Sequence, residues 1–332
     1  MSKDYSISFI RCISMLFIIL CHLFQYYENE IAWWLNVGVQ LFLFISGWLY
    51  ANKKIDDYKK FYEKEFKKIL IPYYIYLLVI SLIYYFFIPD NINLKSFILS
   101  LLLIDTLNGL SHLWFIRYII LCYLLIPLIN NIFKEKKMSV NSLIKLLTVF
   151  LVFELIGLVT KNFFNWTWIN CFVLGFFVNR YKCDIERFTK LKMMFLTTSI
   201  FLISVKIIIK YCIGIKLNGI FLMIFNKYSN ICHLLLCVLL FFLLKKIYSL
   251  LKHSTLRERI LDLSDKYSYY IYITHHIFIL GSLSLFKLID RPIICIPLIV
   301  MLTLVSSVVL YLLTNLLKKI DIVLNEAKRW NW

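Results

Sequence analysis

The chain has 332 residues, of which 61% are hydrophobic and only 17% are charged, and its mean hydropathy is +0.78. A soluble domain carries about 25% charged residues, so this composition excludes an ordinary soluble protein and predicts a polytopic membrane protein. The formal charge of +18 is spread over short loops and forms no single basic stripe, and we therefore expect no nucleic-acid partner.

Apolar segments long enough to cross a bilayer recur through the whole chain. The first is too long for a signal peptide and no cleavage pattern follows it, so we expect it to stay as a helix. Another run, 94–104, is too short to cross and is expected to lie along the interface or to re-enter. We predict an all-α integral membrane bundle of about ten transmembrane helices, the sixth being the shortest, at 5–27, 33–51, 69–88, 112–133, 141–160, 166–179, 193–213, 228–246, 267–287 and 292–315.

The orientation of this bundle follows from the loops. If the amino terminus is inside, the large majority of Lys and Arg residues in short loops fall on the inner side. We therefore expect both termini to be cytoplasmic.

Two ionisable residues interrupt the first apolar segment, Arg11 and His22. Eleven residues at about 100° each bring both side chains to one face of a helix, roughly 16 Å apart along its axis. Ionisable groups in a bilayer usually face protein or water and serve a function. Snorkelling to the headgroups is an equally good interpretation of Arg11 alone. For His22 we favour a functional role over that of a buried structural histidine.

Further polar residues fall at similar predicted depths in the fourth and fifth segments. His112 lies at the outer end of the fourth, Arg117 roughly 7 Å deeper, and Glu154 roughly 9 Å inside the outer end of the fifth. An unpaired Glu inside a membrane would protonate or find a cation, so we predict an ion pair between Arg117 and Glu154. The alternative is that each faces a water-filled cavity separately.

Histidines are predicted at or above the midplane on four helices, namely His22, His112, His233 and the pair His275 and His276. The adjacent pair point about 100° apart, so at most one is expected to face a given site squarely. His253 falls in a charged loop and is assigned no role. No Cys-x-x-Cys pair or histidine spacing builds a zinc site, and we expect no metal.

Most tryptophans fall at predicted helix ends and indicate an interfacial aromatic belt. Trp114 is the exception, because it lies between His112 and Arg117. We expect its ring to stack on a sugar.

These residues belong to motifs that resemble a known family, the bacterial membrane-bound acyltransferases of the acyltransferase-three family, whose members include O-acetyltransferases of cell-surface polysaccharides. The order and spacing of the motifs over nearly the whole chain are specific, although each alone is weak. The motifs are the Arg-x10-His of Arg11 and His22, GVQLFLFISGWLY at 38–50, KEFKKILIPYY at 64–74, SHLWFIRYI at 111–119 and SYYIYITHH at 268–276.

The resemblance implies transfer of an acyl group, commonly acetyl, from cytoplasmic acyl-CoA to an acceptor on the other side of a bacterial plasma membrane. The acceptor is expected to be a hydroxyl of a cell-surface glycan or lipid-linked sugar. We expect a single membrane domain over 1–332 with no fused extracytoplasmic domain. Membrane lipids are expected partners, and a homodimer or envelope-glycan assembly proteins are further candidates.

The resemblance also gives the residues roles. Arg11 and His22 are the expected catalytic residues, with His22 acting as a base or becoming acylated itself. The phosphates of acetyl-CoA are expected to bind Arg11 and the basic stretch before the third span, which contributes Lys64, Lys67 and Lys68. An alternative role for these lysines is to anchor the protein by the positive-inside rule. Lysine in place of the family's usual arginine weakens a bidentate grip on phosphate.

The remaining candidates are substrate-binding groups. A thioester oxyanion needs hydrogen-bond donors, and Ser46, Arg117 and Asn36 are available. An equally good interpretation of Ser46 is a hydroxyl bonded back to its own helix. The full expected acceptor-side set is His112, Trp114, Arg117, Glu154, Ser46 and His275.

Two rival functions remain open at this stage. A carrier or exporter of a lipid-linked sugar or polysaccharide would also be polytopic and basic inside, but the paired Gly or Pro helix breaks of carriers are absent, since the prolines within spans are Pro127 and Pro297. A sensory or partner-binding membrane domain without catalysis is disfavoured by Arg11 and His22.

Overall fold

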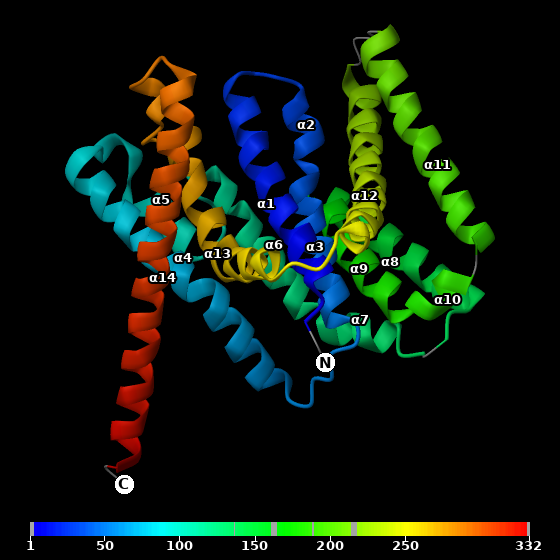
Figure 1. Ribbon diagram of the computed structural model, residues 1–332, viewed down its shortest axis with the longest axis horizontal. Coiled ribbons are helices and arrows are strands. Elements are labelled where there is room, and N and C mark those ends of the chain that lie inside the picture. Colours follow the sequence, from blue (N-terminus) through cyan, green and yellow to red (C-terminus); the bar gives the residue numbers. More distant parts are fainter. Residues whose placement is uncertain (1–2, 136, 161–164, 188, 214–217, 331–332) are drawn as a thin grey trace. The chain divides into compact units, whose positions relative to one another are not determined.

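The computed structural model describes residues 3–135, 137–160, 165–187, 189–213 and 218–330. Every regular element in these residues is a helix, which confirms the all-α prediction (Figure 1). The α-helices are α1 (Tyr5–Tyr26), α2 (Ile31–Leu35), α3 (Val37–Tyr50), α4 (Tyr58–Phe87), α5 (Leu94–Leu101), α6 (Trp114–Leu124), α7 (Ile126–Ile132), α8 (Val140–Val159), α9 (Trp166–Arg180), α10 (Lys182–Arg187), α11 (Thr189–Ile207), α12 (Gly219–Leu250), α13 (Thr255–Ile279) and α14 (Pro292–Trp330). Short helical turns are η1 (Pro89–Asn91), η2 (Ser111–Leu113), η3 (Ile208–Ile213) and η4 (Leu285–Lys287).

Seven of the described helices are long and apolar enough to cross a membrane. An eighth candidate is the pair Ser111–Leu124 and Ile126–Ile132, bent by 45°. Pro127 in the first turn of α7 accounts for the break, because proline has no backbone N–H with which to continue the ladder of α6. The other two predicted spans are also helices, but α9 has only 15 residues and α13 carries charges over its first half. The chain is a multi-pass membrane protein.

The contacts divide the chain into two compact units. Unit 1 consists of Met1–Cys21, Trp33–Asp56 and Cys122–Glu258. Unit 2 consists of His22–Ala32, Asp57–Leu121 and Arg259–Trp332.

The core of unit 1 is organised around the crossing of α3 and α9. A Cβ atom on Gly47 would lie 1.9 Å from the Phe172 carbonyl oxygen, and one on Gly175 would lie 2.0 Å from the Phe44 carbonyl oxygen. Only glycine allows two backbones to approach this closely. Most of α3 is buried, including Gly47 of the second-span motif.

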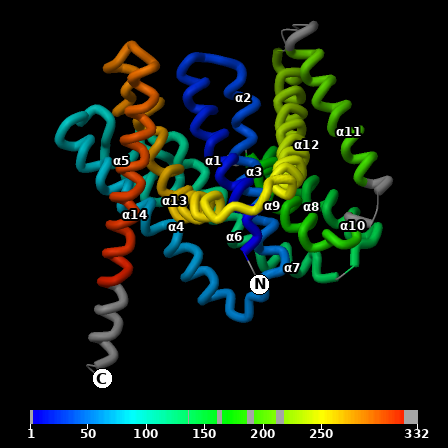
Figure 2. The backbone as a smooth tube through the Cα atoms, viewed as in Figure 1, coloured from blue at the N-terminus to red at the C-terminus, as the bar shows by residue number. Residues whose placement is uncertain are grey.

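In unit 2 the chain doubles back after α4, so that α5 returns along it (Figure 2). Asn93 caps α5 and forms a capping box with Ser96. Tyr73 on α4 donates its hydroxyl to the Ser100 carbonyl at 2.6 Å, and Tyr74 donates to Leu101 at 3.1 Å. The run predicted as interfacial or re-entrant is thus a helix of 8 residues fastened to α4.

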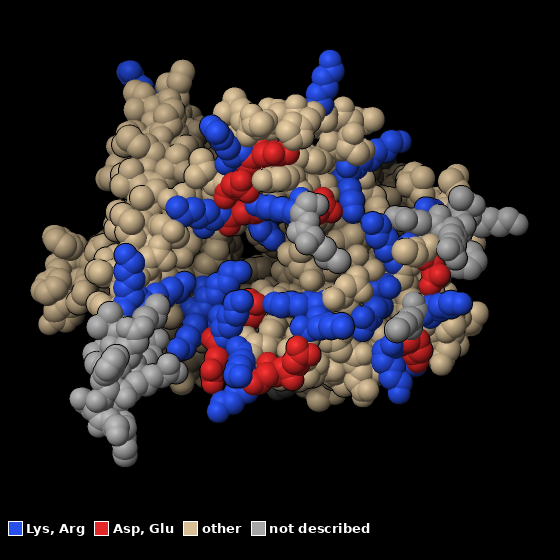
Figure 3. Space-filling model, turned by 60° about the horizontal axis from the view of Figure 1, so that its bottom comes forward, with Lys and Arg blue, Asp and Glu red and all other residues tan. Residues whose placement is uncertain are grey.

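Exposed basic side chains are numerous on the face turned forward in Figure 3. In α4, three of the predicted donor-binding residues are exposed, namely Lys64, Lys67 and Lys68. Their spacing of three and four residues puts them on one face of the helix, whereas Phe61 and Glu65 are buried on another.

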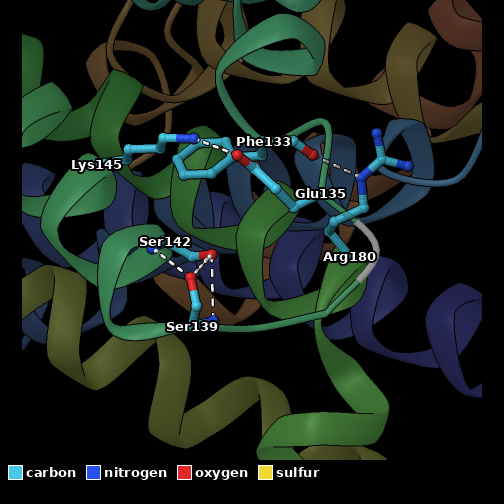
Figure 4. Close-up of polar contacts among 6 residues, drawn as sticks. All are labelled: Phe133, Glu135, Ser139, Ser142, Lys145 and Arg180. Atoms are coloured by element: carbon cyan, nitrogen blue, oxygen red, sulfur yellow. Dashed lines mark hydrogen bonds and ion pairs between the residues drawn. The ribbon is translucent and has the colours of Figure 1, made fainter.

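The connection from α7 to α8 in unit 1 is held by local polar contacts (Figure 4). Ser139 caps α8 by accepting from the Ser142 backbone N–H at 3.2 Å. Lys145 pairs with Glu135, and its hydrogen bond holds the pKa of Glu135 below the ordinary value. Arg180 Nε, at the end of α9, donates to the carbonyl of Phe133, the residue that caps α7, at 3.1 Å. These contacts fix three helix ends.

Candidate functional site

Four histidine rings form one connected cluster within unit 2. They come from three segments: the last turns of α1, the turn η2, and the end of α13. The ring centroid of His22 is 5.2 Å from that of His275 and 4.8 Å from that of His276. The centroid of His112 is 5.4 Å from His275 and 4.5 Å from His276, on which it stacks. This histidine cluster is the candidate active site.

The Thr-His-His sequence of α13 orients two of these rings. Thr274 Oγ1 lies 2.9 Å from Ser307 Oγ on α14, which directs that side chain towards α14. The next two residues follow at about 100° each around the helix, so His275 and His276 turn away from α14. Both rings contact His22, His275 at a tilt and His276 edge-on. The expectation that at most one of them faces a given site squarely stays a prediction.

Glycines let the loop before η2 reach the end of α13. Gly109 has a φ of +75°, in the region that favours glycine. A Cβ on Gly281 would lie 2.8 Å from the Gly109 carbonyl oxygen. The same carbonyl accepts a hydrogen bond from His276 Nδ1 at 3.2 Å, and Tyr272 donates its hydroxyl to the His112 carbonyl. The backbone of this loop is thus part of the cluster.

The rings differ in exposure. His112, His275 and His276 are 3%, 0% and 4% exposed, whereas His22 is half-buried. His22 Nδ1 lies 2.7 Å from Gln25 Oε1. Of the four rings, His22 is the one that a substrate can reach without displacing the others.

Backbone carbonyls determine the proton positions on the buried rings. His112 Nε2 lies 2.9 Å from the Ile273 oxygen, and His275 Nδ1 lies 2.8 Å from the Tyr272 oxygen. Because a carbonyl only accepts, these nitrogens carry the hydrogen, and the other ring nitrogen of each neutral imidazole keeps a lone pair. His112 Nδ1 and His275 Nε2 are buried and have no hydrogen-bond partner among the described residues.

The fifth predicted histidine belongs elsewhere. His233 on α12 lies in unit 1, stacked on Trp33 at 3.7 Å, and its Nε2 bonds the Trp33 carbonyl at 2.8 Å. The buried Lys206 ammonium lies over the same indole. Similar predicted depth grouped His233 with the others, but depth does not give the direction in which a helix face points.

The predicted ion pair between Arg117 and Glu154 is wrong. Glu154 Oε2 pairs with Lys227 Nζ at 2.8 Å, and Glu154 Oε1 accepts from Thr167 Oγ1 at 2.6 Å. Arg117 Nη1 instead donates to the Ile104 carbonyl at 2.8 Å. The predicted span 228–246 began one residue after Lys227, but α12 already begins at Gly219 and carries that lysine inside the helix.

Glu154 therefore belongs to a separate polar site in unit 1. Together with Thr167 and Lys227 it lines a cavity of ≈ 430 Å³ whose other walls are mostly apolar. Its role in substrate binding stays a prediction.

The other candidates are placed as follows. Arg11 is half-buried on α1, the same continuous helix as His22. Trp114 is half-buried, with its ring edge-on to Tyr118 at 5.0 Å. Ser46 Oγ donates to the Phe42 carbonyl of its own helix at 2.9 Å, which is the alternative interpretation given for it.

Two residues of these sites were not among the predicted site residues, namely His276 and Lys227. The signal for His276 was its place beside His275 in the 268–276 motif. For Lys227 the signal was the need of Glu154 for a cation at matching depth. No group of three or more His, Cys, Asp or Glu side chains in the described part of the chain is arranged to hold a metal ion.

Comparison with protein families gives one match over most of the chain. The model of the acyltransferase-three family, described as an acyltransferase domain, matches residues 4–312. Neither curated proteins nor solved structures give a match. Because the matched region contains all four rings of the histidine cluster and nearly the whole sequence, the chain belongs to the acyltransferase-three family and is a membrane acyltransferase.

Proposed function

We propose that the protein transfers an acyl group, commonly acetyl, from cytoplasmic acyl-CoA to a hydroxyl of a cell-surface or lipid-linked glycan. The observation that supports this proposal is the half-buried imidazole of His22 in contact with the buried rings of His275 and His276. An imidazole titrates near neutral pH in water and is the commonest general base in enzymes.

In the proposed reaction, His22 takes the proton of the acceptor hydroxyl as the hydroxyl oxygen bonds to the thioester carbonyl carbon. The bond between that carbon and sulfur then breaks. The proton passes from His22 to the sulfur, which leaves as the thiol of CoA. General-base catalysis of this kind contributes about 10²- to 10⁴-fold.

Arg11 is the proposed contact for the donor phosphates. Eleven residues of the continuous helix α1 separate it from His22, about 16 Å along the axis. That interval suits an extended donor whose charged end lies at Arg11 and whose thioester lies at His22. A guanidinium binds phosphate in a bidentate manner. The exposed Lys64, Lys67 and Lys68 of α4 add positive charge for the same ligand class.

The proposed location is a bacterial plasma membrane, with both chain termini in the cytoplasm. The excess of Lys and Arg in the loops assigned to the inner side supports this orientation.

The experiment is transfer of label from labelled acetyl-CoA in membranes that contain the wild type or a variant. We expect His22→Ala to lower the rate at least about 100-fold. Arg11→Ala is expected to raise KM for acetyl-CoA about 10- to 100-fold, the equivalent of a lost charge-assisted hydrogen bond. His253→Ala is the matched control, because this imidazole is exposed and pairs with Glu258.

Transfer by His22→Ala at the wild-type rate would show that the catalytic assignment is wrong. Purified protein that binds no acyl-CoA but moves a glycan across vesicles would establish the carrier function instead. Label retained on the protein without acceptor would indicate an acylated His22 in place of a base.

A further inference from the structure

The buried imidazole of His275 combines a fixed proton position with an unused lone pair. Its Nδ1 faces two backbone carbonyl oxygens, that of Tyr272 at 2.8 Å and that of Ile271 at 3.1 Å. Nδ1 therefore carries the hydrogen, and Nε2 is an acceptor. This acceptor is buried, belongs to a side chain that is 0% exposed, and has no hydrogen-bond partner among the described residues.

An unsatisfied buried acceptor is unfavourable by about 1–3 kcal/mol and is rare in folded proteins. The His22 ring, with its centroid 5.2 Å from that of His275, is in contact with the imidazole that carries it. A substrate cannot reach His275 directly because the ring is enclosed, whereas His22 is half-buried, contacts His275 and can deliver a proton towards it.

A protonated His22 would need stabilisation, since a positive charge in a bilayer interior is costly. The titratable groups facing its ring are His275 and His276 on α13, with His112 from η2 packed against both. Within the described residues, the hydrogen bonds of these four rings go to backbone carbonyls and to the Gln25 amide, and none involves a carboxylate. In hydrolases a carboxylate orients the catalytic histidine and stabilises its protonated form. Here a neutral imidazole is the group in position to do so.

We infer that His275 is a positioning residue for acyl transfer, which holds His22 and shares the proton that His22 takes from the acceptor hydroxyl. This inference rests on the proposed function. The proton leaves the hydroxyl as its oxygen bonds to the acyl carbon, is held by the two rings while the carbon–sulfur bond breaks, and ends on the CoA sulfur. No net charge is gained or lost by the protein over the cycle.

The test is His275→Asn, assayed with labelled acetyl-CoA in membranes. The amide N–H₂ of asparagine lies close to the position of Nδ1 and can donate to the same carbonyls, whereas nothing replaces Nε2. We expect kcat to fall about 10- to 100-fold with KM for acetyl-CoA unchanged. His275→Gln, whose longer side chain can return an acceptor oxygen near Nε2, is expected to lose less than His275→Asn.

The second measurement adds His275→Asn to His22→Ala. Because His275 acts through His22, the double variant is expected to be within twofold of His22→Ala alone. His233→Gln is the matched control for loss of a buried histidine, since His233 packs on Trp33 in unit 1. It should keep the wild-type rate.

The outcomes separate the two proposals. If His22→Ala is inactive but His275→Asn keeps the wild-type rate, or lowers the rate by the same factor in both backgrounds, the inference about His275 is overturned and the function of His22 stands. If His22→Ala is fully active, the proposed function itself fails. Equal loss in His275→Asn and His275→Gln, with folding intact by size-exclusion chromatography, would also contradict a role for the acceptor.

Discussion

The crossing of α3 and α9 gives a prediction that depends on backbone geometry alone. In Gly175→Ala the new Cβ would lie 2.0 Å from the Phe44 carbonyl oxygen, whereas ordinary van der Waals contact begins at 3.4 Å. The helices must therefore separate by about 1.4 Å at this point, the difference between these two distances. No change of side-chain rotamer relieves the clash, because the opposing atoms are backbone.

The expected effect follows from what that separation disrupts. A gap of 0.5–1 Å already removes about a quarter to a half of the dispersion energy between packed atoms, and overpacking a core is unfavourable by about 1–3 kcal/mol or more. We expect a loss of about 3 kcal/mol. With an unfolding entropy of about 2.1 cal/mol/K per residue, the 332 residues give roughly 0.7 kcal/mol/K, so Tm falls by at least about 4 °C.

The assay is thermal unfolding in detergent, followed by the loss of the monodisperse peak in size-exclusion chromatography. Gly219→Ala is the control, because a Cβ there meets nothing within 4 Å and the only strain is its φ of +58°. That strain is worth about 1–2 kcal/mol. A Tm of Gly175→Ala equal to that of wild type, or a smaller drop than in Gly219→Ala, would refute the reasoning about the crossing.

Two further predictions concern charged groups. Lys227→Met should destabilise unit 1 by about 1–3 kcal/mol, because it leaves the Glu154 carboxylate without its cation. Adding Glu154→Gln should recover most of that stability. Thermal unfolding of the single and double variants is the measurement, and a double variant no more stable than Lys227→Met would contradict the prediction. Asp57 caps α4 by accepting from the Lys60 backbone N–H at 3.1 Å, and this hydrogen bond lowers the pKa of Asp57. The cap therefore stabilises the first turn fully above the ordinary Asp pKa of about 3.9 and is lost as pH falls through the lower folded value. Hydrogen-exchange protection of that turn should decrease on acidification in wild type and stay constant in Asp57→Asn, which caps without titrating.

Periodicity and composition were enough to predict the elements that matter most. Each of the ten predicted spans overlaps a helix, and the spacing of Arg11 and His22 required only that α1 be continuous. Helix ends were harder to predict, because an apolar segment is delimited by its first charged residue, whereas the helix can extend beyond it. Lys227 was left outside for this reason, although α12 extends over 32 residues from Gly219.

Long-range partners could not be predicted from depth. Loop charges and residue counts place a side chain along the membrane normal but do not say which neighbour its helix face meets. Glu154 and Arg117 were paired on depth alone, and the structure gives Glu154 a partner on α12. His233 shared the predicted depth of the cluster yet packs on Trp33.

The property of the site that no sequence pattern reveals is the protonation of its histidines. The tautomers of His112 and His275 are determined by the carbonyls of Ile273 and Tyr272, and these are backbone groups whose residue types carry no such signal. Because each carbonyl holds a hydrogen on one nitrogen, His112 and His275 each keep a buried lone pair, and no hydrogen bond of these rings within the described residues involves a carboxylate. A carboxylate in this position would have to be buried as an anion in the bilayer between reactions, at a penalty of several kcal/mol. Neutral imidazoles avoid that penalty. In the proposed mechanism the charge exists only while a substrate proton is in transit, which favours His275 over Asp or Glu as the group behind a membrane-embedded base.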